Sequence, residues 1–296
     1  MNIDRSSTFA ENQLSIGQCA TLACLLEVCA PKPGNVHRGA DFADMGLVDF
    51  MASATAIGPV LERAEQQSVG TTMLAAVQAT RRVTQANTNL GIILLIAPLA
   101  AVPRSTDLRP GVATVLEQLN DEDARQAFEA IRLVQPGGLK PRDPTEITND
   151  VRHAPQVSLQ DAMQQAAAWD LIARQYVNEF EDVLERVLPG LLDQTDQLEL
   201  VDRIVAAHVQ LMAAIPDTLI ARKSGTSVAQ ESAARASRVL EAGEIGSEAY
   251  QRALSDLDFW LRSSPGRNPG TSADLIAAAL FAGLRDNEIK PPFGFC

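Results

Sequence analysis

The sequence predicts an all-α protein, and three observations carry this prediction. Hydrophobic residues make up 46% of the 296 positions and aromatic residues only 4%. The core must therefore be built from Leu, Ile, Val and Ala, a mixture that favours packed helices over a β-sandwich. Apolar residues recur at helical spacing along most of the chain, whereas strand alternation, hairpin signals and internal repeats are missing. We expect a single multi-helix, bundle-like domain over residues 1–296, with functional loops at helix ends.

Helical spacing and Pro or Gly punctuation define the expected elements in order. In the first half we expect helices at 16–30, 47–64, 71–84, 90–101, 111–119 and 121–134. Ser158 and Asp161 form a capping box that opens a long helix ending at Pro189–Gly190. Further helices are expected at 197–215, 227–242, 247–262 and 272–285. Residues 135–157 are rich in Pro and Gly, and we expect a flexible loop or active-site flap there.

Charge and cysteine usage exclude several classes of protein. The net charge is −12 with a pI near 4.7, and no basic cluster is long enough to bind nucleic acid. The four cysteines contain no Cys-x-x-Cys pair, which favours reduced core residues over disulfides. The longest apolar run, 90–102, contains Pro98 and is too short for a membrane span, and no signal peptide is visible. We expect a cytoplasmic protein that binds no membrane, and its Ala-rich helical surface is compatible with a homodimer.

The first unusual loop follows a carboxylate inside an apolar helix. Glu27 must be solvated, paired or metal-bound, because burying an isolated carboxylate is costly. Cationic and polar residues follow it on a Pro/Gly-shaped loop, together with a further carboxylate: Lys32, Gly34, Asn35, His37, Arg38 and Asp44. Cations facing carboxylates suit a Mg²⁺–phosphate site. The alternative is a surface loop with an ion pair from Glu27 to Lys32 or Arg38.

Three further loops interrupt the helical pattern, and each has a purely structural alternative. Asn87, Thr88, Asn89 and Gly91 open a helix, whose N-terminus can bind an anion or can simply be capped by Thr88 or Asn89. The second loop contains Asp217, Thr218, Arg222, Lys223 and Gly225, which also fit a helix hairpin with solvated charges. The third contains Asn268, Gly270, Ser272 and Asp274, where Thr271 and Asp274 fit a capping box.

Other constellations are missing or weak. Nucleotide-binding glycine motifs, the nucleophile elbow and the zinc-protease motif do not occur. With only three histidines, a multi-histidine zinc site is not expected, and His208 is interpreted as a core or helix-face residue. Trp169 is interpreted as core and Asp170 as part of a solvated face.

Taken in order, the four loops resemble the triphosphoribosyl-dephospho-CoA synthase family, over residues 16–285. The matching stretches contain Glu27, Lys32-Pro33-Gly34, Asp44-Met45, Asn87-Thr88, Gly91, Asp217-Thr218, Arg222, Gly225 and 269–275. The resemblance implies an all-helical enzyme that transfers the triphosphoribosyl group of ATP to the 2′-hydroxyl of 3′-dephospho-CoA and releases adenine. It implies ATP and dephospho-CoA as substrates and Mg²⁺ as cofactor.

By this resemblance we assign candidate roles to the loop residues. Catalytic candidates are Glu27, Asp44 and Asp217, and the metal candidates are these three with Asp274. Substrate-binding candidates are Lys32, Gly34, Asn35, His37, Arg38, Asn87, Thr88, Asn89, Gly91, Arg222, Lys223, Gly225, Asn268, Gly270 and Ser272. The positive side chains would hold phosphates, and the asparagines would bind ribose or phosphate.

One motif departs from the family pattern. The family usually has Asn-Thr-His-Lys-Gly, and this chain has Asn-Thr-Asn-Leu-Gly at 87–91, so a phosphate-binding cation is lost. Three alternatives therefore stay open: a (phospho)ribosyl transferase with another donor or acceptor, a nucleotide hydrolase, and a non-catalytic nucleotide-binding helical protein.

Overall fold

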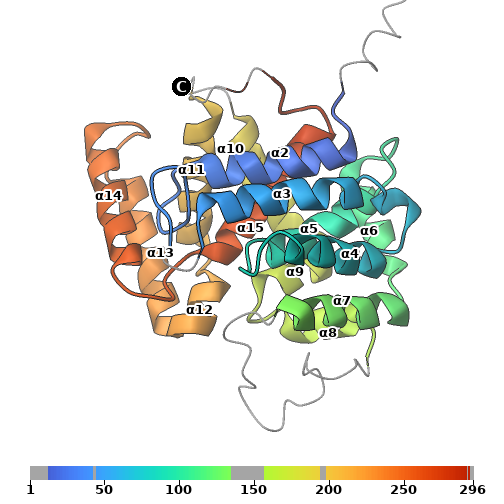
Figure 1. The fold of residues 1–296 in the computed structure, drawn as a ribbon. Coiled ribbons are helices and arrows are strands. Elements are labelled where there is room, and N and C mark those ends of the chain that lie inside the picture. The colour runs from blue at the N-terminus through green and yellow to red at the C-terminus, as the bar shows by residue number, and fades with distance from the viewer. Residues whose placement is uncertain (1–12, 43–44, 135–156, 194–197, 292, 294–296) are drawn as a thin grey trace, which may run out of the picture.

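The structure, a computed structural model, describes residues 13–42, 45–134, 157–193, 198–291 and 293. Within these ranges the chain forms fourteen α-helices, one 3₁₀ turn and one π-helical segment, and no strand (Figure 1). The all-α prediction is confirmed. No single helix in these ranges is long and apolar enough to cross a membrane. The bent pair Leu200–Ala214 and Thr218–Ser224 together has sufficient length and apolar composition. The predicted flap at 135–157 lies almost entirely outside the described residues.

Two apolar helices form the centre of the main core. Nearly every residue of α5 (Leu90–Ala101) and α15 (Gly270–Arg285) is buried, as expected for helices that are apolar on all sides. Helices α2 (Ile16–Cys29) and α3 (Leu47–Leu61) lie side by side across them and are joined by a hydrogen bond from Thr21 Oγ1 to the Ala54 carbonyl at 3.3 Å (Figure 1). The surrounding helices are α2 (Ile16–Cys29), α3 (Leu47–Leu61), α4 (Val69–Arg81), α6 (Leu108–Glu117), α7 (Asp121–Val134), α8 (Leu159–Ala166), α9 (Leu171–Val177) and α10 (Leu188–Leu192).

A second apolar cluster lies among the helices α11 to α14. Their bounds are α11 (Leu200–Ala214), α12 (Thr218–Ser224), α13 (Thr226–Glu241) and α14 (Glu248–Arg262). Tyr250, Leu257 and Leu261 of α14 are buried there against α11 and α13. In Figure 1 these helices stand at one edge of the molecule, beside the loop that follows α2. The candidate residues therefore lie where the two clusters meet.

The long helix expected from Ser158 to Pro189 is wrong, although its start is confirmed. Ser158 accepts a hydrogen bond from the Asp161 amide, but α8 ends at Ala166. Asp170 then caps α9 through two backbone amides, and Glu179 and Phe180 have positive φ values of 56° and 63°. A π-helical segment, Asp182–Val187, follows and leads into α10. Pro189 does not end this helix, because it lies in the first turn, where proline is tolerated.

Candidate functional site

The ends of four helices meet around one aspartate, Asp274, in the second turn of α15. Acidic and basic side chains from other segments act electrostatically on its carboxyl: Glu27, Asp170, Asp217 and Arg222. These residues come from the last turn of α2, the caps of α9 and α12, and α12 itself. The structure thus brings together residues that are separated by up to 247 positions in the sequence. We call Glu27, Lys32, Asp170, Arg222 and Asp274 the carboxylate cluster.

Asp217 joins the N-termini of α12 and α15. Its Oδ1 accepts hydrogen bonds from the amides of Leu219 and Ile220 at 2.8 and 3.0 Å. Its Oδ2 accepts from the amide and hydroxyl of Ser272 at 2.8 and 2.9 Å. Burial raises the pKa of the Asp217 carboxyl, and these donors oppose the rise. Four donors saturate this carboxylate, so Asp217 and Ser272 position the two helices, and neither a metal nor a substrate is needed to explain them.

The predicted capping box of Thr271 and Asp274 is wrong. Helix α15 begins at Gly270, its cap is Pro269, and no side chain of the local sequence caps it. The amide of Ser272, the third residue of α15, donates instead to Asp217, which is 55 residues earlier in the sequence. Thr271 instead lies 3.2 Å from the hydroxyl of Thr218. Asp274 is therefore left without the capping role that would have explained it.

The Asp274 carboxyl lies against the backbone of Gly91 at the start of α5. A Cβ atom at position 91 would be 2.1 Å from Asp274 Oδ2, so only glycine leaves room for this carboxyl. No residue among the described ranges forms a hydrogen bond or ion pair with it. Burial, followed by the negative charges of Glu27 and Asp217, raises the pKa of Asp274 well above its usual range. An unpartnered carboxyl with a raised pKa is typical of a functional position.

Glu27 and Lys32 form a buried ion pair. Lys32 Nζ lies 2.9 Å from Glu27 Oε1, and both side chains are at least 95% buried. The same ammonium donates to the carbonyl oxygens of Glu27 and Ala30. The predicted ion pair between Glu27 and Lys32 is thus confirmed. It is buried, however, and does not lie on a surface loop. A phosphate could reach Lys32 only if this pair opened, so Lys32 here balances the charge of Glu27 beside Asp274.

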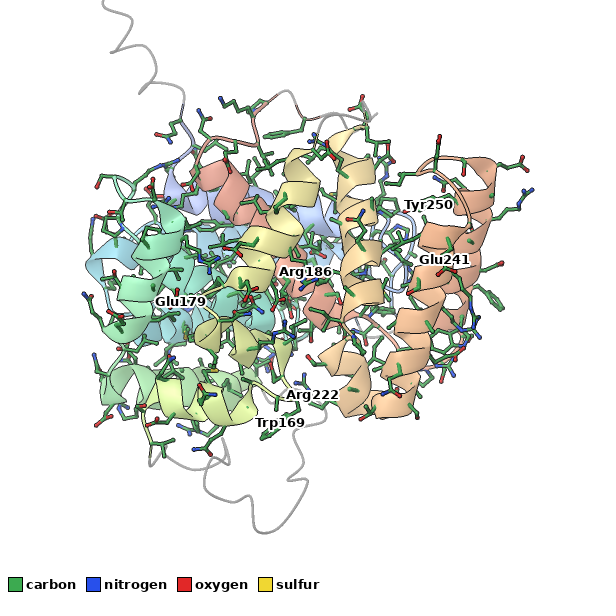
Figure 2. All side chains as sticks on the ribbon, turned by 180° about the vertical axis from the view of Figure 1, so that it is seen from behind. Trp169, Glu179, Arg186, Arg222, Glu241 and Tyr250 are labelled. Atoms are coloured by element: carbon green, nitrogen blue, oxygen red, sulfur yellow. The ribbon has the colours of Figure 1, made fainter. Side chains whose placement is uncertain are left out.

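Arg222 is the cation of the cluster that keeps access to solvent. Its Nη1 lies 3.5 Å from Asp170 Oδ2, and each of the two side chains is 27% exposed. Arg222 Nε is buried and has no hydrogen-bond partner among the described residues. Figure 2 shows Arg222 at one end of the molecule, near Trp169, which is 49% exposed and so is not the core residue expected. Asp170 was expected on a solvated face and instead caps α9 and pairs with Arg222.

The loop after α2 is fixed by α14 and α11. Gly34 has a φ of +74° and donates its amide to Asp258 Oδ1 at 2.7 Å. The carbonyl of Asn35 accepts from Arg262, and its side-chain amide is 3.3 Å from His208 Nε2. His208 is fully buried, as the core interpretation predicted, and burial lowers its pKa well below the usual range. Gly34 and Asn35 are thus held by the protein itself.

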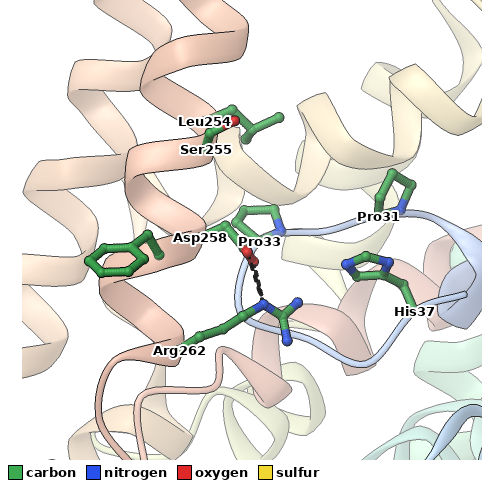
Figure 3. A pocket seen from close by; sticks show the side chains of 8 residues that line it. Pro31, Pro33, His37, Leu254, Ser255, Asp258 and Arg262 are labelled. Carbon is green, nitrogen blue, oxygen red and sulfur yellow. Dashed lines mark hydrogen bonds and ion pairs between the residues drawn. The ribbon is translucent and has the colours of Figure 1, made fainter. Parts of the chain in front are cut away.

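Beyond this loop lies a pocket of about 340 Å³ (Figure 3). It is lined by Pro31, Pro33, His37, Leu254, Ser255, Asp258, Phe259 and Arg262. In Figure 3, His37 lies on one side of the pocket, and Asp258 and Arg262, which are joined by an ion pair, lie on the other. Of the predicted substrate-binding residues, only His37 lines it, and Arg38 is exposed outside it.

A sequence profile of the family described as ATP:dephospho-CoA triphosphoribosyl transferase (CitG) matches residues 13–292. The chain belongs to this family. It is therefore a transferase, as the sequence resemblance predicted. A crystal structure provisionally described as a triphosphoribosyl-dephospho-CoA synthase from Archaeoglobus fulgidus is similar, with 26% identity and a TM-score of 0.60. The match covers 81% of this chain and all of the other. No curated protein matches the sequence.

The altered second motif of this CitG family member faces the protein interior. Asn89 and Thr80 are both buried and bond to each other through their side chains, at 3.1 and 3.2 Å. The Thr88 hydroxyl lies 2.6 Å from that of Ser53. Leu90 is 8% exposed, whereas Asn87 is exposed. Asn89 is the N-cap residue of α5, as predicted, but its side chain makes no capping hydrogen bond.

The remaining predicted residues lie at or near the C-terminal end of α12, except Gly270, which packs against Leu219. Lys223 Nζ is 3.3 Å from Asn268 Oδ1, and Gly225 ends α12 with a φ of +98°. A Cβ at Gly270 would be 2.5 Å from Leu219, so this glycine serves close packing. Asp44 lies outside the described residues. Sequence reasoning missed Asp258 and Arg262, because only contacts with the distant residues Gly34 and Asn35 reveal their function.

Proposed function

We propose that this chain transfers the triphosphoribosyl group of ATP to the 2′-hydroxyl of 3′-dephospho-CoA, with release of adenine. The proposal rests on its membership of the CitG family and on one structural observation. That observation is the carboxyl of Asp274, which has no partner among the described residues and lies against Gly91. The family reaction breaks an N-glycosidic bond, and its transition state carries positive charge on the ribose.

A carboxylate at this position suits both demands of that reaction. Negative charge next to the ribose stabilises the developing positive charge, especially where little water is present. A raised pKa also makes Asp274 a better acceptor for the proton of the attacking hydroxyl than an ordinary aspartate. Asp217 holds the helix that carries Asp274, and Glu27 with Lys32 forms the wall beside it. Arg222, with its unpartnered Nε, is the cation best placed to bind a phosphate.

In this proposal, Mg²⁺ binds together with the triphosphate of ATP. Among the described residues, no group of three or more His, Cys, Asp or Glu side chains lies close enough to enclose an ion. Mg²⁺ commonly binds through substrate phosphates and only one or two carboxylates, and the carboxylate cluster can supply these. The ion would neutralise charge on the phosphates. Of the four predicted metal ligands, Asp217 is saturated, Glu27 is paired with Lys32, and Asp274 fits best.

The proposal is tested by chromatographic detection of free adenine from ATP and Mg²⁺, with and without 3′-dephospho-CoA. Adenine that forms only with the acceptor is the expected result. Adenine that forms equally in both reactions would replace the transferase by a nucleotide hydrolase. Binding of ATP without adenine in either reaction would identify a non-catalytic nucleotide-binding protein, or one that uses another donor. A parallel reaction with EDTA tests the magnesium requirement.

A further inference from the structure

The loop 31–37 borders both the pocket beside α14 and the carboxylate cluster. Pro31 and Pro33 line it, whereas Lys32 between them points to Glu27. Neighbouring side chains of an extended segment point to opposite sides. One loop therefore forms a wall of the pocket with its prolines and a wall of the carboxylate cluster with its lysine.

Four polar side chains line this pocket, His37, Ser255, Asp258 and Arg262, and two of them offer a donor and an acceptor to a ligand. His37 Nδ1 accepts the Gly39 amide at 3.1 Å, which places the proton of a neutral imidazole on Nε2. Burial and the nearby Arg262 lower the pKa of His37, which favours this neutral form. Across the pocket, Asp258 Oδ1 is bonded to Gly34 and Arg262, and Oδ2 only to Arg262 at 2.9 Å. Asp258 Oδ2 thus has an open acceptor position.

Apolar side chains line the pocket beside these two groups. Pro31, Pro33 and Leu254 contribute flat or aliphatic surface, and the pocket volume of about 340 Å³ accommodates a base with part of its ribose. Adenine offers its 6-amino group as a donor and, on the other side of the purine, the ring nitrogen N3 as an acceptor. This pattern is complementary to Asp258 Oδ2 and His37 Nε2–H.

We propose that this pocket binds the adenine base of a nucleotide substrate, with Asp258 accepting from the 6-amino group and His37 donating to the ring. The inference rests on the proposed function, in which donor and acceptor each carry one adenine. The chemistry recognised is the same for both, so the experiment distinguishes ATP from 3′-dephospho-CoA as the source of the base.

The test is a calorimetric titration of each substrate alone, so that no turnover is required. Ser255 is exposed, lines the pocket and bonds only to the Gln251 carbonyl, so Ser255→Trp fills the pocket with little effect on folding. Asp256→Trp is the matched control, because Asp256 is the exposed neighbour on α14 that does not line the pocket. We expect Ser255→Trp to weaken one of the two ligands at least tenfold, and Asp256→Trp to change neither more than twofold.

A second variant and a second ligand keep the inference falsifiable if Ser255→Trp folds poorly. His37→Leu should weaken the same ligand severalfold, and the inosine analogue of that ligand should bind the wild type more weakly than the adenosine form. Unchanged affinity for both substrates in both variants would overturn the adenine pocket, as would equal losses in Ser255→Trp and Asp256→Trp. Because binding is measured without turnover, a wild type that binds normally but releases no adenine would refute the proposed function alone.

Discussion

Two acidic clusters at opposite ends of α9 are built from similar residues but are satisfied very differently. At the end of α9, Asp182 is buried and receives hydrogen bonds from Arg174, Gln175, Asn178 and Arg186. At its start, Asp170 and Arg222 stand next to Asp274, to which the described residues donate no hydrogen bond. Asp182 is buried and its four donors give it a structural role, whereas Asp274 is partly exposed and receives no hydrogen bond from the described residues. Asp274, unlike Asp182, therefore has carboxylate oxygens that are available to a ligand.

The first prediction tests this difference at the level of catalysis. Asp274→Asn keeps the shape of the side chain but removes its charge and its ability to accept a proton. We expect adenine release to fall by about 10²–10⁴-fold, the range typical of a positioned acid or base. Asp182→Asn is the corresponding change in the other cluster, and its activity per folded molecule should stay within a fewfold of the wild type. Equal activity losses in the two variants would remove the functional distinction between the clusters.

Gly91→Ala tests the position of the Asp274 carboxyl without replacing any ionisable group. The added methyl group would collide with Asp274 Oδ2, so the carboxyl must move. A displacement of about 1 Å at a reacting group can cost on the order of 10²-fold in rate. In Gly190→Ala, the control in α10, the nearest atom to the new Cβ is 3.5 Å away, so activity should not change. Steady-state adenine release measures both, and a fully active Gly91→Ala would show that the position of Asp274 is unimportant.

The third prediction concerns the satisfied cluster. Asp182→Ala leaves two arginines and two amide side chains without their common acceptor. Because Arg174 and Arg186 are 39% and 49% exposed, water replaces part of this loss. We expect a loss of about 3 kcal/mol in unfolding free energy, at the low end for a broken buried ion pair. Urea unfolding followed by circular dichroism measures it, and a loss below about 1 kcal/mol would contradict a structural role.

Local patterns in the sequence predicted the helices well and the contacts between them poorly. The expected helices at 90–101 and 121–134 agree with α5 and α7 in both bounds, because apolar spacing and helix breakers act within a few residues. The family resemblance identified Asp274 as a candidate site residue. The sequence could not show that its carboxyl receives no hydrogen bond. Helix α15 is capped by Asp217 instead, which is 55 residues before the Ser272 amide that it accepts from.

The same limit explains the contacts that the sequence did not reveal. Lys32 is a predicted phosphate-binding residue, and the structure adds that its Nζ pairs with the buried Glu27 five residues earlier, in a site whose burial the sequence does not show. Asp170 is separated from Arg222 by 52 positions, and Gly34 from Asp258 by 224. Pairs at such separations are decided by packing of helices on one another. Composition and periodicity contain no information on that packing.

The last prediction is a pH dependence of folding stability caused by Asp274. Burial and neighbouring carboxylates raise the pKa of Asp274 in the folded protein, so the folded state binds a proton more tightly than the unfolded state. As the pH rises above about 4, the unfolded chain loses this proton first, and folding stability must fall until the folded pKa is passed.

Asp274→Asn cannot lose that proton, so its stability relative to the wild type should increase over this pH range. The increase cannot exceed about 1.4 kcal/mol per pH unit, the value for one proton. Urea unfolding midpoints of both proteins between pH 5 and pH 8 measure it. Gly190→Ala, which changes no ionisable group, should differ from the wild type by the same amount at every pH. Parallel curves for Asp274→Asn and the wild type would mean that the Asp274 carboxyl is as well solvated as it is in the unfolded chain, and that the two clusters do not differ in the way proposed.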